Sequence, residues 1–146
     1  MARAGDAAMK IHVNRIPAEG YQEDAAYEPS LLDLDRHDVH FEQPIEVSSL
    51  ITKAAEEVVV RARIRGTARL CCARCLEPFH SPLETEAMLS YHAAPADVLD
   101  ITDDIRQEII LAYPMIPVCR AQCKGLCPAC GQNLNVAGCS HQPKGA

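Results

Sequence analysis

Strict alternation of apolar and polar positions makes residues 57–70 the clearest β-strand of the chain. The even positions are apolar or small, whereas four of the odd positions are arginine. A period of two predicts a strand with one buried face and one basic face. Gly66 is expected to mark a bulge or bend within it. Weaker patterns predict strands over 9–16, 38–49 and 82–92, and Pro44 would confine the second to an edge or a bulge.

One helix is predicted, beginning at Thr102 and ending at Pro114. Thr102 suits the N-cap position, and two aspartates follow it in the first turn, where the helix dipole favours acids. Ile105, Ile109 and Ala112 form one apolar stripe. Residues 17–30 are acidic and contain glycine and proline, which predicts a loop.

Length and composition favour a single globular domain. The chain has 146 residues, of which 48% are apolar and 23% charged, so it can bury a core. We expect a sheet-and-helix core over 10–118, a cysteine-rich tail over 119–141 and a mobile tail over 1–9. No long apolar run or signal-like N-terminus is present, which predicts a cytoplasmic protein without a membrane span. Aromatic residues, at 4%, argue against a base-stacking surface.

Charge is segregated along the chain. The net charge of −6 combines acidic stretches over 1–60 and 81–118 with basic stretches over 61–80 and 119–146. All 8 cysteines lie in the two basic stretches. The overall charge argues against indiscriminate nucleic-acid binding, but the distribution leaves room for a local basic patch.

The cysteine spacing points to metal binding. In a chain without an export signal, a disulfide framework is the less favoured use of cysteine. Two cysteines separated by two residues can turn around one ion, and zinc takes four such ligands in a tetrahedron. Such pairs are Cys72 with Cys75 and Cys127 with Cys130, the latter followed by Gly131, which can adopt left-handed backbone angles.

We favour two structural zinc sites, each closed by four protein ligands. The first would join Cys72 and Cys75 to Cys119 and Cys123. The second would be local and formed by Cys127, Cys130, Cys139 and His141, which leaves Cys71 spare. An alternative places Cys119, Cys123, Cys127 and Cys130 on one ion, but it leaves the first pair without partners in the chain.

Other chemistry fits the sequence less well. A thiol-redox enzyme would require a thioredoxin-like alternation of strands and helices, which is absent. A nucleobase deaminase would require His-x-Glu and Pro-Cys-x-x-Cys. His40 and Glu42 match the first half, but Leu126 replaces the proline before Cys127. No supported set of nucleophile, base and oxyanion donors is found, so we expect no catalytic residues.

The basic side chains suggest an RNA-facing surface. Alternate residues of a strand lie roughly 7 Å apart, so a row of guanidinium groups could follow a phosphate backbone. The alternative is a solvated sheet face opposed by acids of neighbouring strands. The candidate RNA-binding residues are Arg61, Arg63, Arg65 and Arg69 of the strand and Arg74, Arg120 and Lys124 beside the cysteines.

The motif Cys72-Ala-Arg-Cys75-Leu-Glu-Pro-Phe79, with Cys119 and the segment from Cys123 to Asn135, resembles the YceD family. Members are known as large ribosomal RNA subunit accumulation proteins and occur in bacteria and plastids. The resemblance covers roughly residues 10–141. Members that lack the last cysteines tend to keep the other two pairs, which supports the two-site partition. At position 141 the family often has cysteine instead of histidine.

The expected fold is α+β: a mainly antiparallel sheet, one helix and a zinc-ordered, ribbon-like C-terminal tail. The resemblance implies a non-catalytic role in the accumulation or processing of large-subunit (23S) ribosomal RNA. We expect the chain to bind that RNA or its precursor. The alternative is a zinc-stabilised adaptor whose acidic surfaces dock a basic ribosomal protein, with no direct RNA contact.

Overall fold

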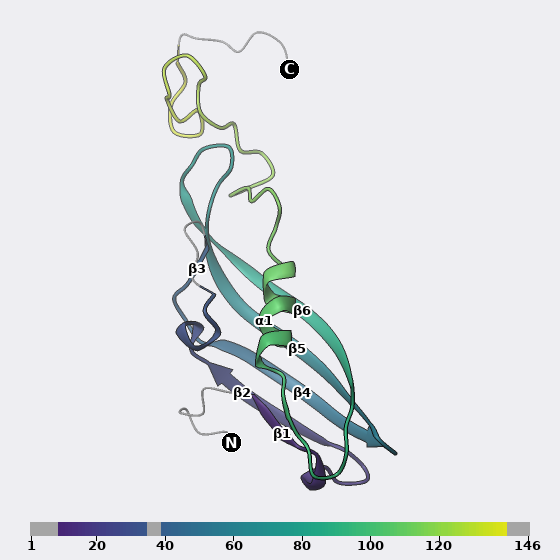
Figure 1. Ribbon diagram of the computed structural model, residues 1–146. Helices are drawn as coiled ribbons and strands as arrows, with labels where there is room; N and C mark the ends of the chain where they lie inside the picture. Colours follow the sequence, from purple (N-terminus) through teal and green to yellow (C-terminus); the bar gives the residue numbers. More distant parts are fainter. Residues whose placement is uncertain (1–8, 35–38, 140–146) are drawn as a thin grey trace.

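The body of the molecule is an antiparallel sheet with a central long hairpin (Figure 1). The computed structural model describes residues 9–34 and 39–139. One side of β5 pairs with β6 along its whole length, and the other side pairs first with β4 and then with β3. Strand β2 pairs with β4. The five strands are β2 (Tyr21–Tyr27), β3 (Val39–Phe41), β4 (Ile45–Ala54), β5 (Glu57–Cys71) and β6 (Pro78–His92).

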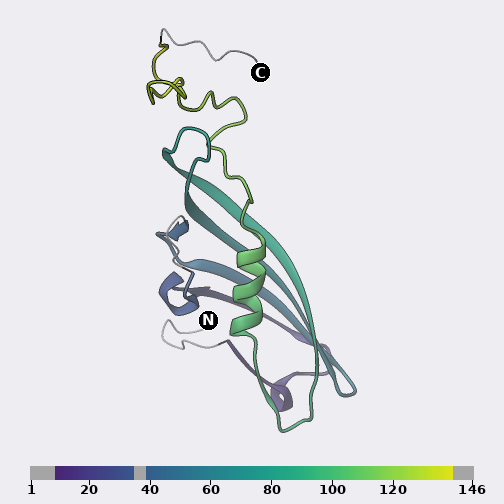
Figure 2. The same cartoon turned by 45° about the horizontal axis from the view of Figure 1, so that its top comes forward.

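The remaining elements cover one face of this sheet. Strand β1 (Lys10–His12) pairs with β7 (Val98–Asp100), and η1 (Val13–Arg15) and η2 (Pro29–Leu32) are short 3-10 helices. Helix α1 (Thr102–Leu111) lies across β5 and β6 in both views (Figures 1 and 2). Ile105 and Ile109 of α1 are fully buried against the apolar face of the sheet. The predicted α+β class, mainly antiparallel with one α-helix among the described residues, is confirmed.

Strand β5 alternates between faces as predicted, but Gly66 does not form the expected bulge. The register with β6 continues without interruption through the pair Gly66 and Leu83. Gly66 instead lies where β5 changes partner from β4 to β3. A Cβ atom there would lie 3.4 Å from Ile45 and 3.5 Å from Phe41, which is ordinary van der Waals contact.

Two local predictions are wrong. Residues 17–30 contain β2, an edge strand in which the half-buried residues alternate with exposed ones, and the start of η2. Their polar character reflects an edge strand with one face toward water rather than a loop. Thr102 is the first helical residue and not the N-cap. Its N–H donates to Asp100 Oδ1 at 3.0 Å, and its hydroxyl accepts the N–H of Met9 at 2.8 Å.

The expected N-terminal tail overlaps the described residues only at Met9. That side chain is 5% exposed, and its carbonyl accepts the N–H of Ile101 at 2.9 Å. Met9 therefore belongs to the core. Within the described residues, no helix has the length and apolar character needed to cross a bilayer.

Candidate metal centre

The first cysteine cluster begins at the turn between β5 and β6. Cys72 N–H donates to the carbonyl of Glu77 at 2.9 Å, and the Cys72 carbonyl accepts the N–H of Leu76 at 2.9 Å. Leu76 has a left-handed φ of 63°. This compact turn brings Cys72 and Cys75 to the same side, at the far end of the hairpin from the β4–β5 turn.

The segment after α1 completes the cluster. Ala73 N–H donates to the carbonyl of Pro117 at 2.8 Å, and Cys119 N–H donates to Cys72 Sγ at 3.3 Å. Arg74 Nη1 donates to the carbonyl of Cys123 at 3.2 Å. These contacts bind the post-helix segment to the hairpin tip. The segment runs beside that tip in both ribbon views (Figures 1 and 2).

The four sulfurs of the first cluster fit a tetrahedral metal ion. They lie within 4.8 Å of one another; the distance is 3.8 Å from Cys72 to Cys123 and 3.7 Å from Cys75 to Cys119. A Zn–S bond of about 2.3 Å gives a tetrahedron edge of about 3.8 Å, whereas a disulfide requires about 2.05 Å. Cys72, Cys75 and Cys123 are buried beside Phe79 and Val118. The donors therefore suit a closed structural site.

Hydrogen bonds prepare part of this cluster to carry negative charge. Burial raises the pKa of Cys72, but N–H donors from Cys75, Cys119 and Arg74 outweigh it and lower the pKa to about 6. Burial and the neighbouring cysteines raise the pKa of Cys119 to about 12. The pKa of Cys123 is lowered because donors from Asn135 and Gly125 outweigh burial. A metal ion would displace the remaining thiol protons.

A second cluster repeats the same turn. Cys127 N–H donates to the carbonyl of Gln132, and the Cys127 carbonyl accepts the N–H of Gly131, both at 2.8 Å. Gly131 has a φ of 75°, the left-handed conformation of Leu76 in the first turn. N–H donors from Cys130 and Ala129 lower the pKa of Cys127 to about 7 against the effect of burial.

Three sulfurs of the second cluster, from Cys127, Cys130 and Cys139, lie within 4.8 Å of one another. The predicted fourth ligand, His141, lies outside the described residues. The structure thus groups the cysteines as the favoured partition has them, and the alternative grouping of Cys119 and Cys123 with Cys127 and Cys130 is not formed among the described residues. Cys71 is exposed, and its Sγ lies 3.1 Å from the carbonyl of Leu76.

The arginine face of β5 is opposed by carboxylates. Arg63 pairs with Glu86 at 2.7 Å, Arg65 with Glu84 at 3.4 Å and Arg69 with Glu42 at 3.7 Å. Arg61 lies in register between two exposed apolar side chains, Leu50 of β4 and Met88 of β6. Glu42 also contacts His80, and His40 pairs in register with Arg69, so neither residue of the His40–Glu42 half-motif belongs to a cysteine cluster.

Two positions near the cysteines were not singled out from the sequence. Asn135 donates its amide to Cys123 Sγ at 3.3 Å. Gly125 has a φ of 74° and packs so closely on the first turn that a Cβ would lie 3.2 Å from the carbonyl of Arg74. The sequence signal that could have pointed to both residues was their position among the clustered cysteines, in the segment from Cys123 to Asn135.

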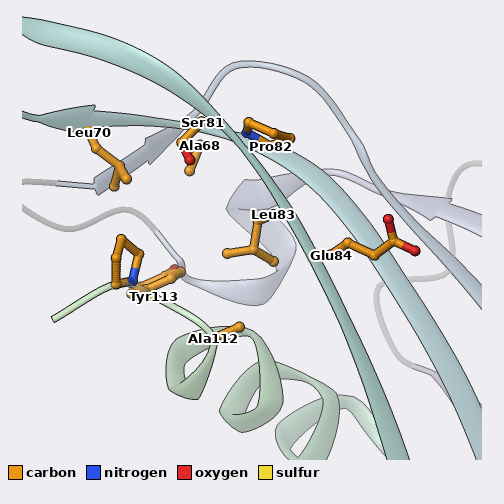
Figure 3. A pocket seen from close by; sticks show the side chains of 9 residues that line it. Ala68, Leu70, Ser81, Pro82, Leu83, Glu84, Ala112 and Tyr113 are labelled. Carbon is orange, nitrogen blue, oxygen red and sulfur yellow. The ribbon is translucent and has the colours of Figure 1, made fainter. Parts of the chain in front are cut away.

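A cavity of about 110 Å³ lies between the end of α1 and the hairpin (Figure 3). Leu70, Leu83 and Tyr113 point into the space between the strands and the helix. Its one carboxylate, on Glu84, pairs with Arg65. The cavity is a packing gap beside the helix end and is separate from the cysteine clusters.

Comparison with known proteins links the cysteine-rich region to one family. Residues 89–145 match the family described as Large ribosomal RNA subunit accumulation protein YceD. A maize protein named Large ribosomal RNA subunit accumulation protein YCED homolog 1, chloroplastic, is 35% identical over 81 residues, which cover 55% of this chain and 26% of that protein.

Two mycobacterial proteins called uncharacterized are also similar. The Mycobacterium leprae protein is 28% identical over 109 residues, 64% of this chain and 50% of the relative. The Mycobacterium tuberculosis H37Rv protein is 28% identical over 127 residues, 76% of this chain and 61% of the relative. The chain thus spans about half to three fifths of these relatives. No solved structure gives a significant match. The resemblance to the YceD family is confirmed by the match of residues 89–145 to the family and by the similarity to the maize protein.

Proposed function

We propose that this chain is a non-catalytic ribosome biogenesis factor that supports the accumulation or processing of large-subunit (23S) ribosomal RNA. The observation that carries the proposal is the family match over residues 89–145, the region that contains six of the eight metal ligands proposed here. A cytoplasmic location fits this role. The proposed ligands are Cys72, Cys75, Cys119 and Cys123 for the first zinc ion and Cys127, Cys130, Cys139 and His141 for the second.

The surface around the first cluster is the better candidate for RNA contact. Arg74 and Arg120 are exposed there together with Lys124, and within the described residues none of the three pairs with an acid. Zinc with four thiolates carries a charge of about −2 and the same turn contains Glu77, so these three cations would offset the negative charge of the hairpin tip, while Arg120 and Lys124 stay available to phosphate. The arginine face of β5, by contrast, is largely balanced by carboxylates.

The test is crosslinking in cells followed by sequencing of the attached RNA. The wild-type chain should give a sharp peak on large-subunit ribosomal RNA. A variant with Arg120→Gln and Lys124→Gln should lose most of that peak, because phosphate contacts supply much of the affinity. Arg74 is left unchanged in it because its guanidinium holds the Cys123 carbonyl.

A matched control removes the same charge at the other end of the sheet. Lys53 lies at the end of β4 next to the β4–β5 turn, and Arg15 lies in η1, whose Val13 bonds to the loop after β6. Arg15→Gln with Lys53→Gln should keep the RNA peak. A third variant has Arg61, Arg63 and Arg65 changed to alanine. The change in its RNA peak measures how much the arginine face of β5 contributes to RNA binding.

One observation favours the adaptor alternative. Leu111, Met115 and Ile116 are 78%, 99% and 71% exposed at the end of α1 and just after it. They lie in an acidic stretch, residues 81–118, which suits a basic ribosomal protein. The adaptor function would take the place of direct RNA binding if the chain crosslinks only to proteins. These crosslinks should be lost in a variant that combines Met115→Ser with Ile116→Ser.

A further inference from the structure

The loop between Cys130 and Cys139 belongs to the second cluster by sequence but returns to the first cluster in space. Leu134 N–H donates to the carbonyl of Gly125 at 2.9 Å. The Asn135 side chain contacts the two residues before Gly125: its Oδ1 accepts the N–H of Lys124 at 2.8 Å, and its Nδ2 donates to Cys123 Sγ at 3.3 Å. A ligand of the first cluster therefore receives a hydrogen bond from the loop of the second.

The orientation of the Asn135 amide is fixed by its partners. Nδ2 also donates to Asn133 Oδ1 at 3.0 Å, and Asn133 Oδ1 accepts the Asn135 N–H at 3.0 Å. Rotating the amide by half a turn would place Oδ1 against the sulfur and the Asn133 oxygen, and Nδ2 against the N–H of Lys124. Only one orientation satisfies all three partners, and it directs an N–H at Cys123.

The ends of this loop are ligands of the second cluster. At its start, the loop is held by two turn hydrogen bonds: the Gly131 N–H donates to the Cys127 carbonyl, and the Cys127 N–H donates to the Gln132 carbonyl. Its far end reaches Cys139, whose sulfur lies within 4.8 Å of those of Cys127 and Cys130. A metal ion on these sulfurs would close the loop at both ends and hold Asn135 in place.

We propose that Asn135 is a positioning residue that couples the two cysteine clusters, so that metal bound at the second cluster strengthens metal binding at the first. The inference rests on the metal loading proposed above. A hydrogen bond to a ligand sulfur stabilises thiolate charge, and such supporting contacts change metal affinity by about 10- to 100-fold. Coupling between binding sites is reciprocal, so metal at the first cluster strengthens the second by the same factor.

The experiment uses the full chain and Cd²⁺, which gives a separate nuclear magnetic resonance signal in each cluster. The signals are assigned by their loss in Cys75→Ser and Cys130→Ser. Competition with a chelator, read at each signal, then gives two affinities. Asn135→Asp keeps Oδ1 for the Lys124 N–H but removes the donor to Cys123. We expect it to weaken the first cluster by about 10- to 100-fold. Gln132→Ala changes an exposed side chain of the same loop and should leave both affinities unchanged.

The coupling is tested by disabling the second cluster. Cys130→Ser with Cys139→Ser should weaken the first cluster by a factor similar to that of Asn135→Asp. Adding Asn135→Asp to that background should then have little further effect, because the loop is already released. Circular dichroism verifies that the sheet remains folded in each variant.

The results separate the two levels of the proposal. A wild-type chain that binds no metal overturns both the metal loading and the coupling. A chain that binds two ions, with a first-cluster affinity unchanged in Asn135→Asp and in the disabled variant, keeps the metal sites and overturns the coupling. Additive losses in the combined variant also overturn it, because Asn135 would then act independently of the second cluster.

Discussion

At the scale of single residues, the two cysteine turns use the same pair of hydrogen bonds but different residues at the left-handed position. The first has Leu76 at a φ of 63°, and the second has Gly131 at 75°. A side chain in this region costs about 1–2 kcal/mol, whereas glycine adopts it without steric cost. The first turn therefore carries a local strain that the second avoids.

Leu76→Gly should stabilise the chain. The Leu76 side chain is 62% exposed, so little burial is lost. Relief of about 1–2 kcal/mol is partly offset by the greater freedom of glycine in the unfolded chain, which leaves a gain of about 0.5–1 kcal/mol. Urea unfolding of the metal-loaded protein measures it. A loss of stability would mean that Leu76 contributes contacts that outweigh its backbone strain.

Gly125→Ala should cost more than Gly131→Ala. Both glycines have positive φ, but an added Cβ at position 131 meets nothing within 4 Å, whereas at position 125 it lies 3.2 Å from the carbonyl of Arg74. We expect a cost of about 1 kcal/mol at position 131 and clearly more at 125, since crowding adds to strain. Urea unfolding of the metal-loaded protein compares the two variants. Equal losses of stability would show that the segment around Gly125 shifts to relieve the contact without a free-energy cost.

At the scale of elements, the hairpin of β5 and β6 organises the fold. Its apolar face carries α1, and its tip carries Cys72 and Cys75. Tyr91 near the end of β6 donates its hydroxyl to the Asp104 carboxylate in the first turn of α1. Burial, followed by the carboxylate, raises the pKa of Tyr91, which therefore keeps its proton as the donor. This hydrogen bond fixes where the helix begins on the sheet.

Tyr91→Phe should loosen the start of α1. It removes one partly buried hydrogen bond to a carboxylate, which is worth about 1–2 kcal/mol. Urea unfolding should show that loss, and amide exchange should rise first in α1. Ser90→Ala is the control, because Ser90 donates to Glu57 on the exposed side of the same strand and does not contact the helix. Equal effects of the two variants would contradict the role of Tyr91.

How far an element could be predicted depended on its surroundings. The alternation of β5 was visible because the strand is paired on both sides and buried on one face. Strand β2 was missed because an edge strand needs few apolar residues. Strand β7 was missed because three residues are too few to show an alternating pattern. The cysteine groups followed from ligand spacing, but the role of Asn135 depends on contacts between loops that no spacing rule describes.

At the scale of the whole molecule, the clusters form an extension beyond a sheet that has its own core. The main core contains residues of the sheet, η2 and α1, whereas Cys72, Cys75 and Cys123 form a separate small buried group. The segment from 119 to 139 has no helix or long strand of its own. Its order depends on the cysteines rather than on apolar burial.

Metal removal should therefore unfold the extension and leave the sheet intact. After treatment with a strong chelator, hydrogen exchange should accelerate at Cys123, Cys127 and Leu134, whose N–H groups are bonded within the extension. Amides of β4 and β5 should keep their protection and serve as the internal control. Loss of protection in both regions would show that the clusters and the sheet unfold as one unit.

The two pairs of ligands in the first cluster are far apart in the sequence, and this affects the order in which the chain folds during its synthesis. Cys75 and Cys119 are 44 residues apart, and β6, β7 and α1 lie between them. A chain made from its N-terminus exposes the hairpin tip with only two of the cluster's four proposed ligands, Cys72 and Cys75, before the other two are made. Two of the four ligands cannot complete the proposed zinc site. Closing the cluster is thus a late event, and a chain interrupted before residue 119 could fold its hairpin yet never acquire the extension that the family match covers.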